Sequence, residues 1–161
     1  MASRQPRRRD DGPVGLVLAG GGARGAYEAG VLSVLLPELA RQGARPTVFV
    51  GTSAGAINAT LYASLAHLPA DEAAAMALDR WRSVHAQMVF RPAWQTLPPL
   101  GLRYAAALVG SPERLTGLLD TGPLARTLAT LLDWEQLGRN LQAGTLDALA
   151  VVTTECETGR T

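Results

Sequence analysis

The chain has 161 residues, which is enough for one globular domain and too few for two of ordinary size. Hydrophobic residues make up 47% of it and charged residues 18%, so there is ample apolar material for a core. The formal net charge of +1 gives no electrostatic reason to expect a nucleic-acid partner. A single cysteine, Cys156, excludes an internal disulfide and a multi-cysteine metal site.

The first 13 residues are polar and rich in arginine, and they predict a disordered leader before a domain that spans residues 14–161. Their charges are followed by Asp10-Asp11-Gly12-Pro13 instead of the apolar stretch that a secretory signal needs. No apolar run approaches the length of about 18 residues that indicates a transmembrane helix. We therefore expect a cytoplasmic protein, for which contact with a membrane surface stays open.

Strand and helix patterns alternate at the start of the domain. Residues 14–19 (VGLVLA) and 47–50 (TVFV) are short apolar runs typical of buried parallel strands. Helical spacing begins at Ala26, and Pro37 should kink or end this first helix early. A second helix is expected over residues 56–67. This alternation predicts an α/β fold in which a mainly parallel sheet has helices on its faces.

The rest of the chain predicts further helices and one more strand. We expect a helix over 69–84, followed by an irregular, proline-interrupted stretch over 90–110 that contains a short helix at 102–109. Residues 111–113 read as an N-cap followed by a proline start, and a helix is expected from about 122 with its inward residues at Leu124, Leu128, Leu131 and Leu132. A helix capped by Asp133 and ending near 141 and a strand over 146–153 complete the pattern. Three strands are few for so many helices. The pattern therefore predicts the front part of a larger domain.

The turn after the second strand is the strongest candidate for chemistry. It reads Gly51-Thr52-Ser53-Ala54-Gly55, a Gly-x-Ser-x-Gly sequence between a strand and a helix. In that context the pattern is typical of a nucleophile elbow, whose glycines permit a tight turn and leave the serine open to a substrate carbonyl. The alternative is a glycine-rich turn in which Ser53 is an ordinary N-cap.

A Ser-His-Asp triad is disfavoured because the histidines are badly placed. The sequence has His67 and His85 and no other histidine. His67 ends the helix that Ser53 begins, about 18 Å away at the usual helical rise. His85 follows a helix in a stretch without the marks of an active-site loop. A triad would need a histidine beyond residue 161.

The glycine run after the first strand has two interpretations. Its six residues are Gly20, Gly21, Gly22, Ala23, Arg24 and Gly25. They satisfy the G-x-G-x-x-G fingerprint of dinucleotide-binding domains, but the second strand does not end in the acidic residue that the fingerprint requires, and Glu38 lies on the intervening helix. The alternative is an oxyanion hole, in which backbone N–H groups stabilise a tetrahedral intermediate beside Ser53.

These two glycine motifs, in this order and spacing, resemble the patatin-like phospholipase family. The stretches 119–124 (LDTGPL) and 151–160 (VVTTECETGR) are also similar to bacterial members. The resemblance implies a three-layer α/β/α fold and hydrolysis of lipid acyl esters by a Ser-Asp dyad through an acyl-serine. It implies no metal or cofactor. A phospholipase, a lysophospholipase and a generic esterase are not distinguished.

The chain departs from the family at the aspartate, which the resemblance places in an Asp-Gly-Gly or Asp-Gly-Ala motif downstream of the serine. The acidic residues after Ser53 are Asp71, Glu72, Asp79, Glu113, Asp120, Asp133, Glu135, Asp147, Glu155 and Glu157. None is followed by Gly-Gly or Gly-Ala. We therefore expect a fragment without its general base that is nearly inactive alone, or else an inactive binding module with the same fold. The stretch 90–104 is expected to be either a lid or membrane-facing loop, or buried packing.

Overall fold

The computed structural model describes residues 13–89, 91 and 122–155. The elements, in chain order, are β1 (Val14–Leu18), α1 (Arg24–Arg41), β2 (Pro46–Thr52), α2 (Ala54–Ser64), α3 (Ala70–Ser83), α4 (Ala86–Val89), α6 (Gly122–Leu131), α7 (Trp134–Gln142) and β3 (Ala148–Val152). The leader up to residue 12, the proline-interrupted stretch from residue 92, the helix at 102–109 and Cys156 lie outside the described residues.

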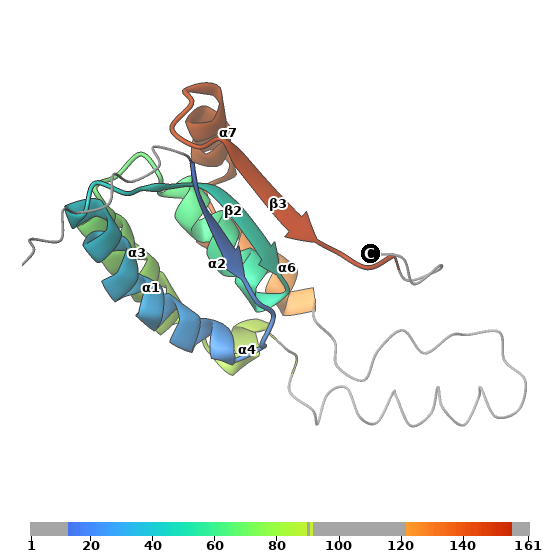
Figure 1. Ribbon diagram of the computed structural model, residues 1–161. Helices are drawn as coiled ribbons and strands as arrows, with labels where there is room; N and C mark the ends of the chain where they lie inside the picture. The colour runs from blue at the N-terminus through green and yellow to red at the C-terminus, as the bar shows by residue number, and fades with distance from the viewer. Residues whose placement is uncertain (1–12, 90, 92–121, 156–161) are drawn as a thin grey trace, which may run out of the picture.

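The three strands form one parallel sheet in the order β1-β2-β3, which confirms the predicted α/β class. The register aligns Leu16, Phe49 and Leu149 on one face of the sheet. Both crossovers advance in the same direction across the sheet, and right-handed connections then place their helices on the same face. Figure 1 shows this arrangement, with α2 packed against all three strands and α1 and α3 beside it.

Helix α2 is the central element of the core. Nine of its eleven residues are buried, which suits a helix that is apolar all round. Its last two carbonyl groups, Ala63 O and Ser64 O, accept hydrogen bonds from Asn140 Nδ2 at 2.8 and 3.0 Å, and the Arg45 guanidinium donates to Ala66 O just beyond the helix. The cation also complements the negative end of the helix dipole. These contacts fix the end of α2 that lies away from Ser53.

Helix α1 does not end at Pro37, so of the two expected effects, a kink or an early end, the early end is wrong. The helix continues to Arg41, and Gln42 N–H closes the last turn on Glu38 O at 3.1 Å. Leu32 and Leu36 are buried in the core on the inner face. Packing of this face outweighs the hydrogen bond that a proline removes from a helix.

The capped helix near the end of the chain is confirmed. Asp133 precedes α7, and its Oδ1 accepts a hydrogen bond from Gln136 N–H at 2.8 Å. In α6 the expected inward side is also found, with Leu131 buried and Leu128 packed against the core. The short helix α4 was not expected from the sequence.

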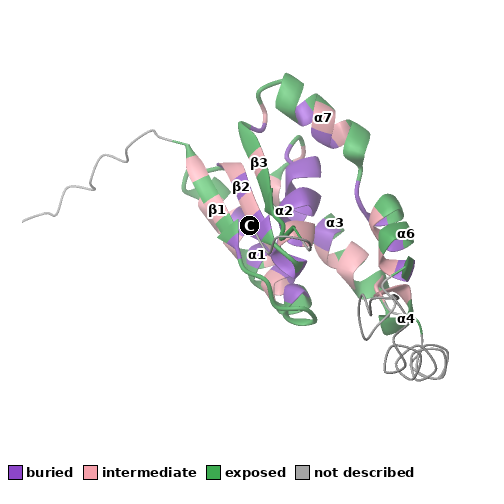
Figure 2. Cartoon of the chain, turned by 90° about the vertical axis from the view of Figure 1, so that its right-hand side faces the viewer, coloured by how far each residue is buried: buried purple, intermediate pink, exposed green. Residues whose placement is uncertain are grey.

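The sheet is less buried than its apolar strands predict. In β1 only Leu18 is buried and Val17 is 79% exposed, while Val152 of β3 is 39% exposed. The register places Val17, Val50 and Ala150 together on the face that the described helices leave uncovered. Figure 2 shows the exposed residues of these strands, with the helices to one side. The described residues thus supply one of the two helical layers of a three-layer fold.

Candidate active site

Ser53 occupies the sharp turn between β2 and α2. Its backbone angles are φ 52° and ψ −122°, and among the described residues it is the one residue other than glycine with a positive φ. An ordinary N-cap has extended backbone angles and a side chain that accepts from the helix, and Ser53 has neither. Its side chain is exposed. Ser53 therefore precedes α2 without capping it in the ordinary way, and its strained, exposed position is the one that a nucleophile elbow requires.

The glycines on either side of Ser53 are required by close backbone contacts. A Cβ on Gly51 would lie 2.5 Å from Ala56 Cα and 2.6 Å from its N. A Cβ on Gly55 would lie 2.5 Å from the carbonyl carbon of Leu18, at the end of β1. No real Cβ tolerates such distances. The first turn of α2 is therefore pressed onto both strands that carry the glycine motifs.

The glycine loop lies directly beside the elbow. A Cβ on Gly20 would be 3.2 Å from Ser53 Cβ and 3.3 Å from Thr52 O. This proximity follows from the parallel pairing of Leu18 with Gly51, after which both chains leave the same edge of the sheet. The structure thus brings together the two motifs that the sequence analysis paired.

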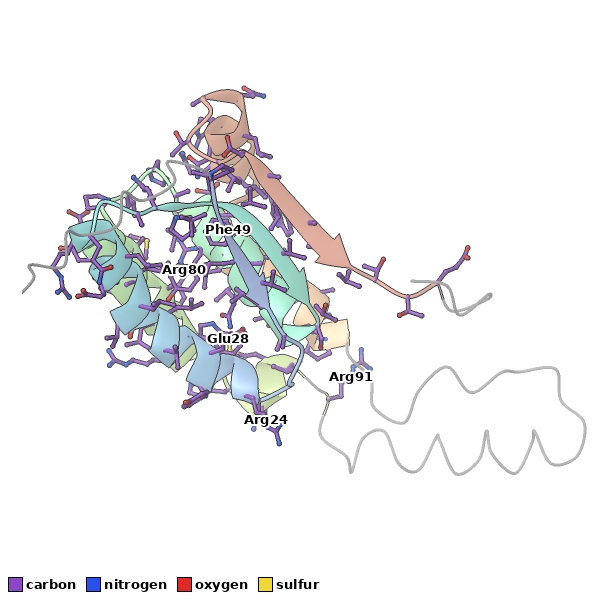
Figure 3. The ribbon with its side chains drawn as sticks, in the orientation of Figure 1. Arg24, Glu28, Phe49, Arg80 and Arg91 are labelled. Atoms are coloured by element: carbon purple, nitrogen blue, oxygen red, sulfur yellow. The ribbon has the colours of Figure 1, made fainter. Side chains whose placement is uncertain are left out.

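The N–H groups of the loop fall into two sets. Arg24 N–H donates to Gly21 O at 3.1 Å and Gly25 N–H donates to Gly22 O at 3.0 Å, so both are engaged in the turn that starts α1. Within the described part of the chain, the N–H groups of residues 20–23 donate no hydrogen bond, and these residues are exposed. The Arg24 side chain lies against Gly21 at the start of α1 (Figure 3).

A buried polar cluster behind the loop joins α1, α2 and α3. Asn58 is fully buried on α2, and its Nδ2 donates to Gly25 O at 2.9 Å and to Glu28 Oε2 at 2.7 Å. Trp81 Nε1 of α3 donates to Asn58 Oδ1 at 2.6 Å. Figure 3 shows Glu28 on the side of α1 that faces the core. The sequence analysis missed this cluster, although an asparagine at a core position of an apolar helix indicates buried hydrogen-bond partners.

Neither histidine belongs to the site. His67 is exposed just beyond α2, at the far end of the helix from Ser53, and His85 is exposed after α3. Among the described residues, no side chain forms a hydrogen bond with Ser53 Oγ, and no cluster of His, Cys, Asp or Glu could hold a metal ion.

The third strand also ends near the site. Thr52 pairs with Val152, so the residues that follow β3 leave the sheet at the same edge as Ser53.

A small apolar cavity lies at the opposite end of β2. It has a volume of about 30 Å³ and its lining includes Leu36, Pro46, Phe49 and Tyr62. This volume suits about one water molecule and excludes an acyl chain. Burial raises the pKa of the Tyr62 hydroxyl from 10.0 to about 12. The cavity is a packing feature and not a substrate site.

A parallel sheet with a strained, exposed serine at a strand–helix turn and a glycine loop beside it is an arrangement that α/β hydrolases also have. The family model of patatin-like phospholipases matches residues 16–157. The chain therefore belongs to the patatin-like phospholipase family, a family of lipid acyl hydrolases, and the resemblance is confirmed. No curated protein and no solved structure matches the chain. Among the described helices, none has the length and apolar character needed to cross a bilayer.

Proposed function

We propose that this chain carries the nucleophile and the oxyanion-stabilising groups of a lipid acyl hydrolase, with Ser53 as the nucleophile. The observation that carries the proposal is the positive φ of Ser53, 52°, at an exposed turn that contacts the glycine loop. A strained backbone at a residue with a side chain is retained where function needs it. A merely structural turn would place a glycine there, because glycine adopts a positive φ without steric strain.

In the proposed reaction, Ser53 Oγ attacks the carbonyl carbon of an acyl ester. The alcohol leaves with the proton that Ser53 Oγ loses on attack. Water then hydrolyses the acyl-serine, which releases the carboxylic acid and restores the Ser53 hydroxyl. The negative charge on the carbonyl oxygen is stabilised by unengaged N–H groups of residues 20–23 and by those of Ala54 and Gly55 at the start of α2. Arg24 and Gly25 contribute to the shape of the loop instead, because their N–H groups already donate within it.

The general base is expected to be an aspartate in an Asp-Gly-Gly or Asp-Gly-Ala motif, and no acidic residue after Ser53 in this sequence has that context. General-base catalysis contributes about 10²–10⁴ in rate. We therefore expect almost no ester turnover from these 161 residues alone. The second candidate, an inactive binding module, is favoured by the same observation.

The test is covalent labelling with a fluorophosphonate probe, followed by peptide mapping and by a p-nitrophenyl butyrate assay. We expect a selective adduct on Ser53 that Ser53→Ala abolishes and that Ser83→Ala, at an exposed helical serine, retains. Without a general base, only the deprotonated Ser53 hydroxyl reacts with the probe. The labelling rate should therefore rise about tenfold per pH unit, without a plateau near neutrality. Ester turnover that Ser53→Ala abolishes would show that a base is present. Labelling spread over several serines would favour the binding module.

A further inference from the structure

The Asn58 cluster consists of Gly25 O, Glu28, Asn58 and Trp81. Its position links the two motifs of the site, because Gly25 closes the glycine loop and Asn58 lies on the helix that begins after Ser53. A Cβ on Gly25 would also lie 2.9 Å from Ala54 Cβ and 3.0 Å from the Trp81 ring. The start of α1 is thus held against the first turn of α2 from two sides.

The amide of Asn58 has a fixed orientation. Its Nδ2 donates to both Gly25 O and Glu28, and its Oδ1 accepts from Trp81. A buried amide is tolerated only when such partners are present, since burial without them is costly. Because Gly25 is already within helix α1, the bond to its carbonyl is not needed to complete the helix. What the bond adds is a constraint on where the loop lies relative to α2.

The glycine loop has few other constraints. Residues 20–24 are exposed, and among the described residues the backbone hydrogen bonds of this loop stay within it or join it to the start of α1. Oxyanion donors act well only if they are held within about 0.5 Å of the productive position. A misplacement of about 1 Å costs on the order of 10²-fold in rate.

We propose that Asn58 is a positioning residue that holds the glycine loop in place relative to Ser53, by linking Gly25 O and Glu28 of α1 to Trp81 of α3 through α2. This inference rests on the proposed function for its effect on reactivity. The placement of the loop itself does not depend on that function and is measured separately.

The matched control is Asn140, a second buried asparagine that contacts α2. It is 1% exposed, and its Nδ2 donates to Ala63 O and Ser64 O at the other end of the helix. Asn58→Ala and Asn140→Ala both remove a buried amide that donates to backbone carbonyls. Only the first removes a contact with the loop.

Two measurements are made on the full chain: amide hydrogen exchange of residues 24–26, whose N–H groups donate to the carbonyls of residues 21–23 in the loop, and the maximal rate of fluorophosphonate labelling at Ser53. We expect Asn58→Ala to speed exchange in the loop about tenfold or more and to lower the labelling rate about 10- to 100-fold, with little change in the half-saturating probe concentration. Asn140→Ala should leave both within twofold. Glu28→Gln, which keeps an oxygen acceptor, should stay near the parent chain.

Should Asn58→Ala fail to fold, Asn58→Leu replaces it, since a side chain of similar size fills the space but cannot donate to Gly25 O or Glu28. Equal loop exchange in the Asn58 and Asn140 variants overturns the proposal, whether or not Ser53 is labelled. Absence of labelling in the parent chain contradicts the proposed function and leaves the exchange result to decide on Asn58. Slower labelling with unchanged loop exchange also contradicts positioning.

Discussion

Replacing Ser53 by glycine should leave the chain more stable than replacing it by alanine. The backbone angles of φ 52° and ψ −122° lie where a residue with a Cβ is strained by about 1–3 kcal/mol. Glycine is free of that strain, although its greater freedom in the unfolded chain costs about 0.5–1 kcal/mol. The glycine variant should therefore exceed the alanine variant by about 0.5–2 kcal/mol in free energy of unfolding.

The assay is urea unfolding followed by tryptophan fluorescence, with equal slopes required before midpoints are compared. Ser33, in the middle of α1, is the matched control position. In a helix, glycine is less stable than alanine by about 1 kcal/mol, so the order of the two variants should reverse there. If the glycine variant is more stable than the alanine variant at both positions, or less stable at both, backbone strain does not determine the effect at Ser53. That result would refute the strained elbow.

Two further predictions concern packing and pH. Gly55→Ala should destabilise the chain by about 1–3 kcal/mol or more, because the new Cβ would meet the backbone of Leu18. Gly30→Ala should be neutral or stabilising, because a Cβ there would meet no atom within 4 Å outside its own helix backbone. The urea midpoints of the two variants check this. The pKa of Tyr62 is raised from 10.0 to about 12, so the folded state keeps its proton while the unfolded state ionises. Stability should therefore be unaffected below pH 10 and fall by up to about 3 kcal/mol as pH rises from 10 to 12. Tyr62→Phe should remove this loss of stability between pH 10 and 12, and Tyr27→Phe, at an exposed tyrosine, should leave it unchanged. If the urea midpoints of the two variants change equally with pH, the prediction is contradicted.

The features that the sequence predicted well are those set by local chemistry. A glycine on each side of Ser53 indicates a tight turn whatever surrounds it, and the structure has that turn. Asp133 caps α7 through a hydrogen bond to a residue three positions away. The parallel pairing of β1 with β2 follows from the short crossover through α1.

The features that the sequence did not predict depend on residues far apart in the chain. Val17 is apolar, but its burial depends on whether another layer covers that face of the sheet. Pro37 is tolerated because Leu36 beside it is held in the core. The role of Asn58 depends on partners from two other helices, about 30 positions earlier and about 20 later, and no local pattern specifies them.

The contact between the first turn of α2 and the end of β1 limits how substrate preference can evolve or be engineered. Gly51 and Gly55 admit no side chain, so the innermost wall of the site is backbone and is the same for every substrate. In the proposed hydrolase, selectivity among acyl esters would then depend on side chains at the border of this wall, of which Thr52, Ala23 and Arg24 are exposed. A mutational library aimed at altered acyl preference should vary these positions and leave the glycines unchanged.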